Sequence, residues 1–181
     1  MNCLEEKILF VPACLLCPSL MAKKSTLSIE WRSIVLQQLI KSNFSIIQMP
    51  CPEASFPSFA EGLQRSPHGV DYYENLPGFV NHCANLGLQV VSQIDALMRN
   101  GYNVCGIVGI EHSPTCAATF MYTHLGTQKR QGIFINHLTN SLAELGYSIP
   151  IIGINRRFPQ KAVNRLIIID EELSKENRYL E

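Results

Sequence analysis

Three cysteines of this chain occupy similar places, each at the end of an apolar run with a proline nearby. Cys14 lies in VPACLLCP, Cys51 in MPCPE and Cys116 in GIEHSPTC. Thiolates are the soft ligands that zinc and iron–sulfur centres select. The alternative for each cysteine is ordinary packing, because free cysteine often serves as a small apolar core residue.

Alternating strand and helix patterns must position these thiols. Short continuous apolar runs predict buried strands, and these runs are 8–16, 44–49, 104–110, 149–154 and 166–169. Apolar residues at helical spacing predict helices over 29–40, 80–98 and 133–145. Because parallel strands need a crossover, usually a helix, we expect an α/β, Rossmann-like three-layer fold with a mostly parallel sheet of four to five strands.

The predicted sheet gives the cysteines a common location. In open parallel sheets, ligands bind beyond the carboxyl ends of the strands. Cys14, Cys51 and Cys116 lie at or just past three such ends, so we expect them to meet at one edge of the sheet.

The composition limits the class of protein. The 181 residues, 46% of them hydrophobic, are enough for one sizeable core, so we expect a single domain over residues 1–181. Residues 54–78 lack periodicity and predict a binding loop or lid. Fifteen Lys and Arg balance fifteen Asp and Glu, which indicates neither duplex nucleic acid nor an anionic membrane as a partner. Seven cysteines, an odd number, favour a reducing cytoplasm over a disulfide framework.

The uncharged run 8–22 has some features of a lipoprotein signal peptide, with VPAC at the cleavage position. Glu5 and Glu6 precede it where positive charge is expected, and Pro12 and Pro18 would break a helix there. The run is also too short to cross a bilayer. We therefore expect a cytoplasmic protein that does not contact the membrane.

The ordered set ACLL, MPCPE and HSPTC resembles the ACLLG, CPE and SPSCG motifs of the DUF523 family, which contains the thiouracil desulfurases (TudS) and related desulfidases. The resemblance covers nearly the whole chain. It implies a [4Fe–4S] cluster with one open iron site, held by Cys14, Cys51 and Cys116. It also implies non-redox removal of sulfur from a small thiolated nucleobase or nucleoside: the thiocarbonyl sulfur binds the open iron, water attacks the carbon, and hydrosulfide leaves.

Catalytic candidates lie beside the proposed ligands. Glu53 is the candidate base that activates water; the alternative is a carboxylate that accepts backbone N–H bonds. Ser113 is the candidate for holding the water or the substrate carbonyl, and the alternative is a cap on the turn formed with Pro114. Glu111 and His112 are second-rank candidates for proton transfer.

Substrate-binding candidates come from the loop. Tyr72 and Tyr73 are candidates for stacking on a planar base, and Arg65 for meeting a carbonyl or phosphate; a solvated loop with aromatic anchors is the alternative. Arg156 and Arg157 follow the fourth expected strand and either meet an anionic group or form an exposed basic pair.

The chain departs from the family pattern where CPSLMAKKS replaces a glycine and an RYDG-like stretch, and where Thr115 and Ala117 replace serine and glycine. Cys14 and Cys17 also form a CxxC, which is typical of thioredoxin-like redox sites at the start of a helix. The remaining alternatives are a non-catalytic cluster-binding or sulfur-binding protein, a zinc protein, and a nucleotide-binding protein with core cysteines.

Overall fold

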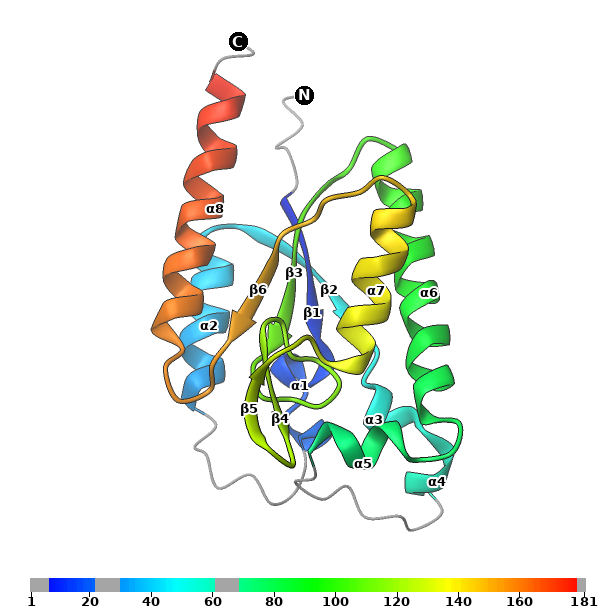
Figure 1. Ribbon diagram of the computed structural model, residues 1–181. Helices are drawn as coiled ribbons and strands as arrows, with labels where there is room; N and C mark the ends of the chain where they lie inside the picture. The colour runs from blue at the N-terminus through cyan, green and yellow to red at the C-terminus, as the bar shows by residue number, and fades with distance from the viewer. Residues whose placement is uncertain (1–6, 22–29, 61–68, 179–181) are drawn as a thin grey trace.

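The computed structural model describes residues 7–21, 30–60 and 69–178. Four parallel strands form its main sheet in the order β2-β1-β3-β6 (Figure 1). They are β1 (Lys7–Pro12), β2 (Phe44–Met49), β3 (Asn103–Ile110) and β6 (Ile151–Ile154). The expected mostly parallel sheet is confirmed.

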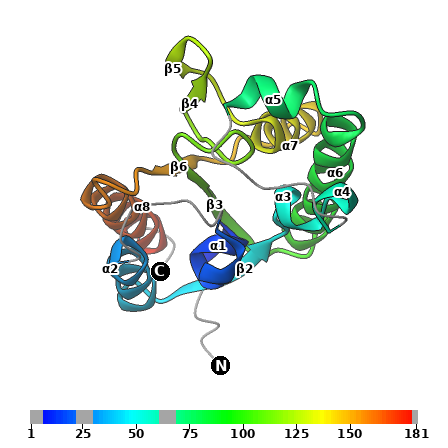
Figure 2. The same ribbon diagram turned by 90° about the horizontal axis from the view of Figure 1, so that it is seen from below.

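Helices cover both faces of this sheet, which gives the expected three-layer, Rossmann-like architecture (Figures 1 and 2). On one side α2 (Glu30–Lys41) packs against α8 (Gln160–Arg178), and on the other α6 (Phe79–Arg99) packs against α7 (Ile133–Glu144). The helical spacing found in the sequence corresponds to the buried faces, as with Trp31, Val35 and Leu39 of α2. No helix within the described ranges is long and apolar enough to cross a membrane.

The first strand is shorter than expected. β1 ends at Pro12, and a short helix, α1 (Ala13–Leu16), continues the run that was predicted as strand. The guanidinium of Arg32 in α2 donates to the carbonyls of Leu15 and Leu16, 2.8 and 2.9 Å away, so the end of α1 is satisfied. Cys14 therefore lies on a helical turn directly after the strand.

The expected strand at 166–169 is wrong. These residues belong to α8, where Leu166 and Ile169 are buried three positions apart while Ile168 is 42% exposed. That spacing is helical, and an apolar run this short does not distinguish a buried strand from a helix.

The segment 54–78 contains more local structure than the sequence indicated. The described part includes the end of α3 (Pro52–Ser55) together with α4 (Pro57–Ala60) and α5 (Val70–Glu74). A short 3-10 helix, η1 (Pro18–Leu20), lies earlier in the chain, after α1. Phe56, Phe59 and Tyr73 pack around Phe79 at the start of α6. The role of segment 54–78 as a binding loop or lid stays a prediction.

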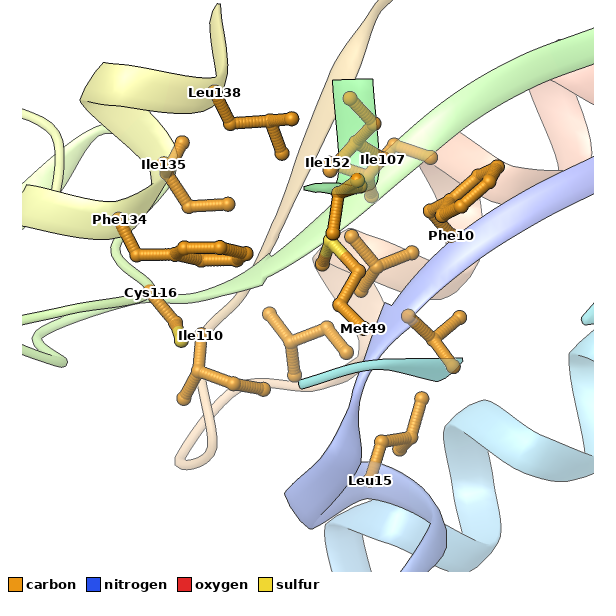
Figure 3. Packing of buried hydrophobic residues seen from close by; sticks show 14 of the residues in the cluster. Phe10, Leu15, Met49, Ile107, Ile110, Cys116, Phe134, Ile135, Leu138 and Ile152 are labelled. Atoms are coloured by element: carbon orange, nitrogen blue, oxygen red, sulfur yellow. The ribbon is translucent and has the colours of Figure 1, made fainter. Parts of the chain in front are cut away.

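An antiparallel hairpin of β4 (Phe120–Thr123) and β5 (Gly126–Lys129) was not expected from the sequence. It lies beyond the carboxyl ends of the main strands, near α5 (Figures 1 and 2). The hydrophobic core lies behind it, where Met49 and Ile107 of the sheet approach Ile135 and Leu138 of α7 (Figure 3).

Candidate functional site

Three strand ends deliver the three predicted cysteines to one edge of the sheet. Cys14 follows β1 in α1, Cys51 follows β2 as the N-cap of α3, and Cys116 lies in the loop after β3. Seen from below, α1 and α3 lie beside each other at the end of the sheet (Figure 2). None of the three cysteines is in a disulfide, and Cys116 is buried while the other two are half-buried.

The thiols of Cys14 and Cys116 each lie within electrostatic range of Cys51 and Glu53. Burial, then the charges of Cys51 and Glu53, raise the pKa of Cys14 from 9.0 to about 12, and Arg156 partly opposes them. Burial, followed by Cys51 and Cys14, raises the pKa of Cys116 well above its ordinary value. Such effects require proximity. We call Cys14, Cys51, Cys116 and Glu53 the thiol site.

The loop that carries Cys116 is held firmly by backbone bonds. The carbonyl of Cys116 accepts from Ile110 N at 2.8 Å, returning the loop to the end of β3. The first amides of α7 donate to the loop, Ile133 N to Pro114 O and Phe134 N to Thr115 O, each at 3.0 Å. The side chain of Cys116 lies near Ile110 and Phe134 (Figure 3).

Gly132, the N-cap of α7, allows this close approach. A methyl group there would lie 2.4 Å from the carbonyl carbon and oxygen of Thr115 and 2.7 Å from Ala117 N. Because these neighbours are backbone atoms, we expect Gly132→Ala to lower the free energy of unfolding by about 1–3 kcal/mol or more, measured by urea denaturation.

Gly87→Ala is the matched control for that substitution. Gly87 lies in α6, where a methyl group would meet nothing closer than 3.4 Å. Alanine is also the better helix former by about 0.5–1 kcal/mol. Equal stability of the two variants would contradict the close-packing account of Gly132.

Glu53 is buried, 8% exposed, and both of its carboxylate oxygens accept hydrogen bonds. Thr115 Oγ1 donates to Oε1 at 3.1 Å and Tyr73 Oη donates to Oε2 at 3.3 Å. Two hydroxyl groups are thus among the donors to this carboxylate, and its role as the base stays a prediction.

Ser113 makes the contacts of a turn cap. Its Oγ accepts from Cys116 N at 3.1 Å and lies 3.3 Å from Thr115 Oγ1. Thr115 Oγ1 also lies 3.4 Å from Cys116 Sγ, so one hydroxyl joins the carboxylate to a thiol. Sequence reasoning missed this role of Thr115, although it precedes the motif cysteine. A role of Ser113 in holding water or substrate stays a prediction.

The second-rank candidates have separate environments. Glu111 Oε2 accepts from Thr119 N and Phe120 N at 3.2 and 2.8 Å, which fixes the start of the hairpin. His112 has a positive φ of 67° and stacks on Tyr122, with ring centroids 4.7 Å apart. Glu111 is thus engaged with backbone, while His112 faces an aromatic ring.

The predicted substrate-binding residues are only partly brought to the site. Tyr73 is 1% exposed, and its hydroxyl bond orients Glu53. Tyr72 is half-buried and packs edge-on against Tyr73. Arg65 lies outside the described residues. Stacking of a substrate on the tyrosines therefore stays a prediction.

Arg156 has electrostatic partners in the thiol site. It lies two residues beyond β6 and is half-buried, while Arg157 is exposed. Burial lowers the pKa of Arg156, and its electrostatic partners Cys14, Glu53 and Tyr122 raise it. A positive charge therefore stands near the carboxylate of Glu53 and the thiol of Cys14.

The other described cysteines differ in position. Cys105 Sγ donates to the carbonyl of Ile8 at 3.2 Å within the sheet, and Cys17 is the half-buried C-cap of α1. Cys83 is fully buried on α6; burial, then Glu53 and Cys51, raise its pKa to about 12. Among the described residues, no three His, Cys, Asp or Glu side chains form a group placed to hold a metal ion.

Asp71 of α5 links that helix to the hairpin. His124 N donates to its Oδ2 at 2.7 Å, and His124 Nδ1 lies 2.8 Å from Oδ1. The backbone bond, then the side-chain bond, lower the pKa of Asp71 below 3.8. A pKa depressed by folding means that this link stabilises the fold above about pH 4 and is lost as the pH falls through the folded pKa.

Carboxyl titration by NMR checks this link. We expect the pKa of Asp71 to rise only part of the way toward 3.8 in His124→Ala, because the backbone bond from residue 124 remains, while the lowered pKa of Asp95, which depends on Tyr147 and Arg99, stays unchanged. The effect on stability is small because both partners are solvent-exposed. An unchanged Asp71 pKa would show that the imidazole of His124 does not bind this carboxylate.

The fold and the site define a Rossmann-like α/β protein with a cluster of thiols and a carboxylate beyond its strand ends. No family model matches the chain. A stretch of 83 residues, 45% of the chain, is 29% identical to the uncharacterized protein MJ0003 of Methanocaldococcus jannaschii and covers 49% of that protein. The chain therefore spans about half the length of this curated relative. No solved structure matches.

Proposed function

We propose that this chain is an iron–sulfur-dependent, non-redox desulfidase that removes sulfur as hydrosulfide from a small thiolated nucleobase or nucleoside. The observation that carries the proposal is that Cys14, Cys51 and Cys116 follow the ends of three neighbouring strands and lie within electrostatic range of one another and of the buried Glu53. The similarity of the three ordered motifs to those of the DUF523 family supports the choice of chemistry.

The cofactor that we assign is a [4Fe–4S] cluster, with Cys14, Cys51 and Cys116 as ligands. The donor set fits: three cysteines outside any disulfide come from three separate segments and influence one another electrostatically. Thiolates of a cluster bind different irons, so they stand further apart than ligands of one ion. When bound, a cluster with three protein ligands supplies an open iron that acts as a Lewis acid toward the leaving sulfur.

Glu53 supplies the base for the hydrolytic step. It takes one proton from water as the water oxygen bonds to the thiocarbonyl carbon. The remaining hydroxyl proton moves to sulfur as the carbon–sulfur bond breaks, so that a carbonyl group and hydrosulfide form and Glu53 returns its proton to solvent. Substrate carbon keeps its oxidation level, so no reductant is needed. Thr115 and Tyr73 hold the carboxylate in one orientation through their hydroxyl bonds.

Cysteines outside disulfides and an oxygen-sensitive cluster suit a reducing compartment, so we assign the protein to the cytoplasm. The balanced charge of the chain supports a small substrate rather than duplex nucleic acid or a membrane surface.

The test is release of hydrosulfide from 2-thiouracil and 4-thiouridine by anaerobically reconstituted protein. We expect one hydrosulfide for each oxygen-substituted product formed, with Cys51→Ala as the inactive control. Iron-loaded protein that releases no hydrosulfide from either compound would overturn the desulfidase proposal and favour a non-catalytic cluster-binding or sulfur-binding protein.

A further inference from the structure

An aromatic stack borders the thiol site on the side of the hairpin. Tyr122 of β4 stacks on His112 with ring planes 29° apart and centroids 4.7 Å apart. Tyr122 is still 47% exposed, so much of its ring remains open to a ligand. An exposed aromatic ring of this kind offers a stacking platform for a planar heterocycle.

The backbone of His112 holds the stack in place. His112 N donates to Phe120 O at 2.7 Å, which ties the loop to β4. The residue has a left-handed φ of 67°. This backbone conformation is costly for a residue other than glycine and persists only where the surroundings enforce it. Its Nδ1 is buried and has no hydrogen-bond partner within the described part of the chain.

Arg156 adds a positive charge within electrostatic range of both the stack and the thiol site. Its electrostatic partners include Tyr122 of the stack and Cys14 and Glu53 of the thiol site. Guanidinium is always protonated in proteins and binds carboxylate and phosphate groups well. A ring stacked on Tyr122 would thus have a cation beside it and the thiol site nearby.

We infer that Tyr122, His112 and Arg156 form a recognition surface for a planar heteroaromatic anion, with the ring on Tyr122 and the negative charge at Arg156. The charge comes either from the ring itself or from an attached phosphate. The orientation of the reactive edge toward Glu53 rests on the proposed function, but the binding of the anion does not.

Calorimetric titration of the anaerobically purified full chain with sulfur-free probes tests this surface. Uridine 5′-monophosphate carries its charge on a phosphate, orotate carries it on the ring, and uridine is neutral. We expect at least one anion to bind more tightly than uridine, and the anion that does so identifies the source of the charge. Binding of neither anion more tightly than uridine would overturn the inference.

Substitutions locate the binding. Arg156→Gln should weaken the preferred anion about tenfold or more, the loss expected for a charge-assisted bond, and leave uridine unchanged. Arg157→Gln, at the exposed neighbour, should change neither. An equal loss in both arginine variants would show nonspecific electrostatics and contradict the assignment.

The platform is tested in the same way. Tyr122→Ala should weaken binding roughly fivefold or more, while Tyr122→Phe retains it. Tyr102→Ala is the matched control, because Tyr102 is 49% exposed but precedes β3, at the opposite end of the sheet. Circular dichroism checks that each variant folds; full binding by a folded Tyr122→Ala would overturn the platform.

The two proposals fail separately. Sulfur-free probes cannot be turned over, so the predicted binding pattern without hydrosulfide release would retain the recognition surface and reject the desulfidase. Hydrosulfide release with unchanged binding and turnover in Arg156→Gln and Tyr122→Ala would reject the surface alone.

Discussion

Replacing Cys116 with alanine is expected to remove the iron and acid-labile sulfide of the reconstituted protein and to lower desulfidation more than about 100-fold. Loss of a partner that merely orients a metal ligand already costs about 10–100-fold in affinity or activity, so loss of a ligand should cost more. Residue 117, the next in the chain, is already alanine, and the substitution at 116 removes a single buried sulfur. We therefore expect the fold to persist.

The other cysteines provide matched controls. Cys14→Ala and Cys51→Ala should give the same loss as Cys116→Ala, because all three belong to the thiol site. Cys105→Ala breaks only the bond to the carbonyl of Ile8 and should cost stability by about 1 kcal/mol without loss of iron. Unchanged iron and sulfide in folded Cys116→Ala would remove this residue from the ligand set.

Replacing Glu53 with glutamine is expected to lower turnover by roughly 10²–10⁴-fold while leaving the cluster in place, since this is the usual contribution of a general base. Glutamine has nearly the same shape, and the hydroxyls of Thr115 and Tyr73 can both donate and accept. Single-turnover kinetics at matched iron content measures the effect.

Removing either hydroxyl partner of the Glu53 carboxylate should have an intermediate effect on turnover. Thr115→Val and Tyr73→Phe each remove one hydroxyl bond to Glu53, so each should lower turnover less than Glu53→Gln does. A hydrogen bond to a charged group contributes about 1.5–3 kcal/mol, which corresponds to roughly 10–150-fold. Glu144→Gln, at an exposed position in α7, should have no effect. Normal turnover by iron-loaded Glu53→Gln would show that Glu53 is not the base.

The sequence predicted the main sheet because its strands are buried on both faces and therefore continuous in hydrophobicity. β1 has Leu9, Phe10 and Val11 fully buried in succession. The same continuity made residues 166–169 look like a strand, since a run of four apolar residues has no visible period. The hairpin was missed because its Gly126–Lys129 strand is exposed along its whole length and has no apolar alternation.

The candidate site was predictable where topology alone decides. Cys14, Cys51 and Cys116 follow parallel strands, and parallel strand ends share an edge. The hydroxyl partners of Glu53 could not be predicted, because Thr115 and Tyr73 are 62 and 20 residues away in sequence and reach it only through packing. The choice between an anion-binding role and an exposed position for Arg156 was left open for the same reason.

The most direct test of the desulfidase account is the iron, zinc and acid-labile sulfide content of anaerobically purified and reconstituted protein, with visible spectra before and after addition of 2-thiouracil. We predict about four irons and four sulfides per chain and a spectral change on addition of the thiolated base. Colourless protein without iron or labile sulfide, even after reconstitution, would contradict the account: bound zinc would favour a zinc protein, and no metal would favour a nucleotide-binding fold with core cysteines.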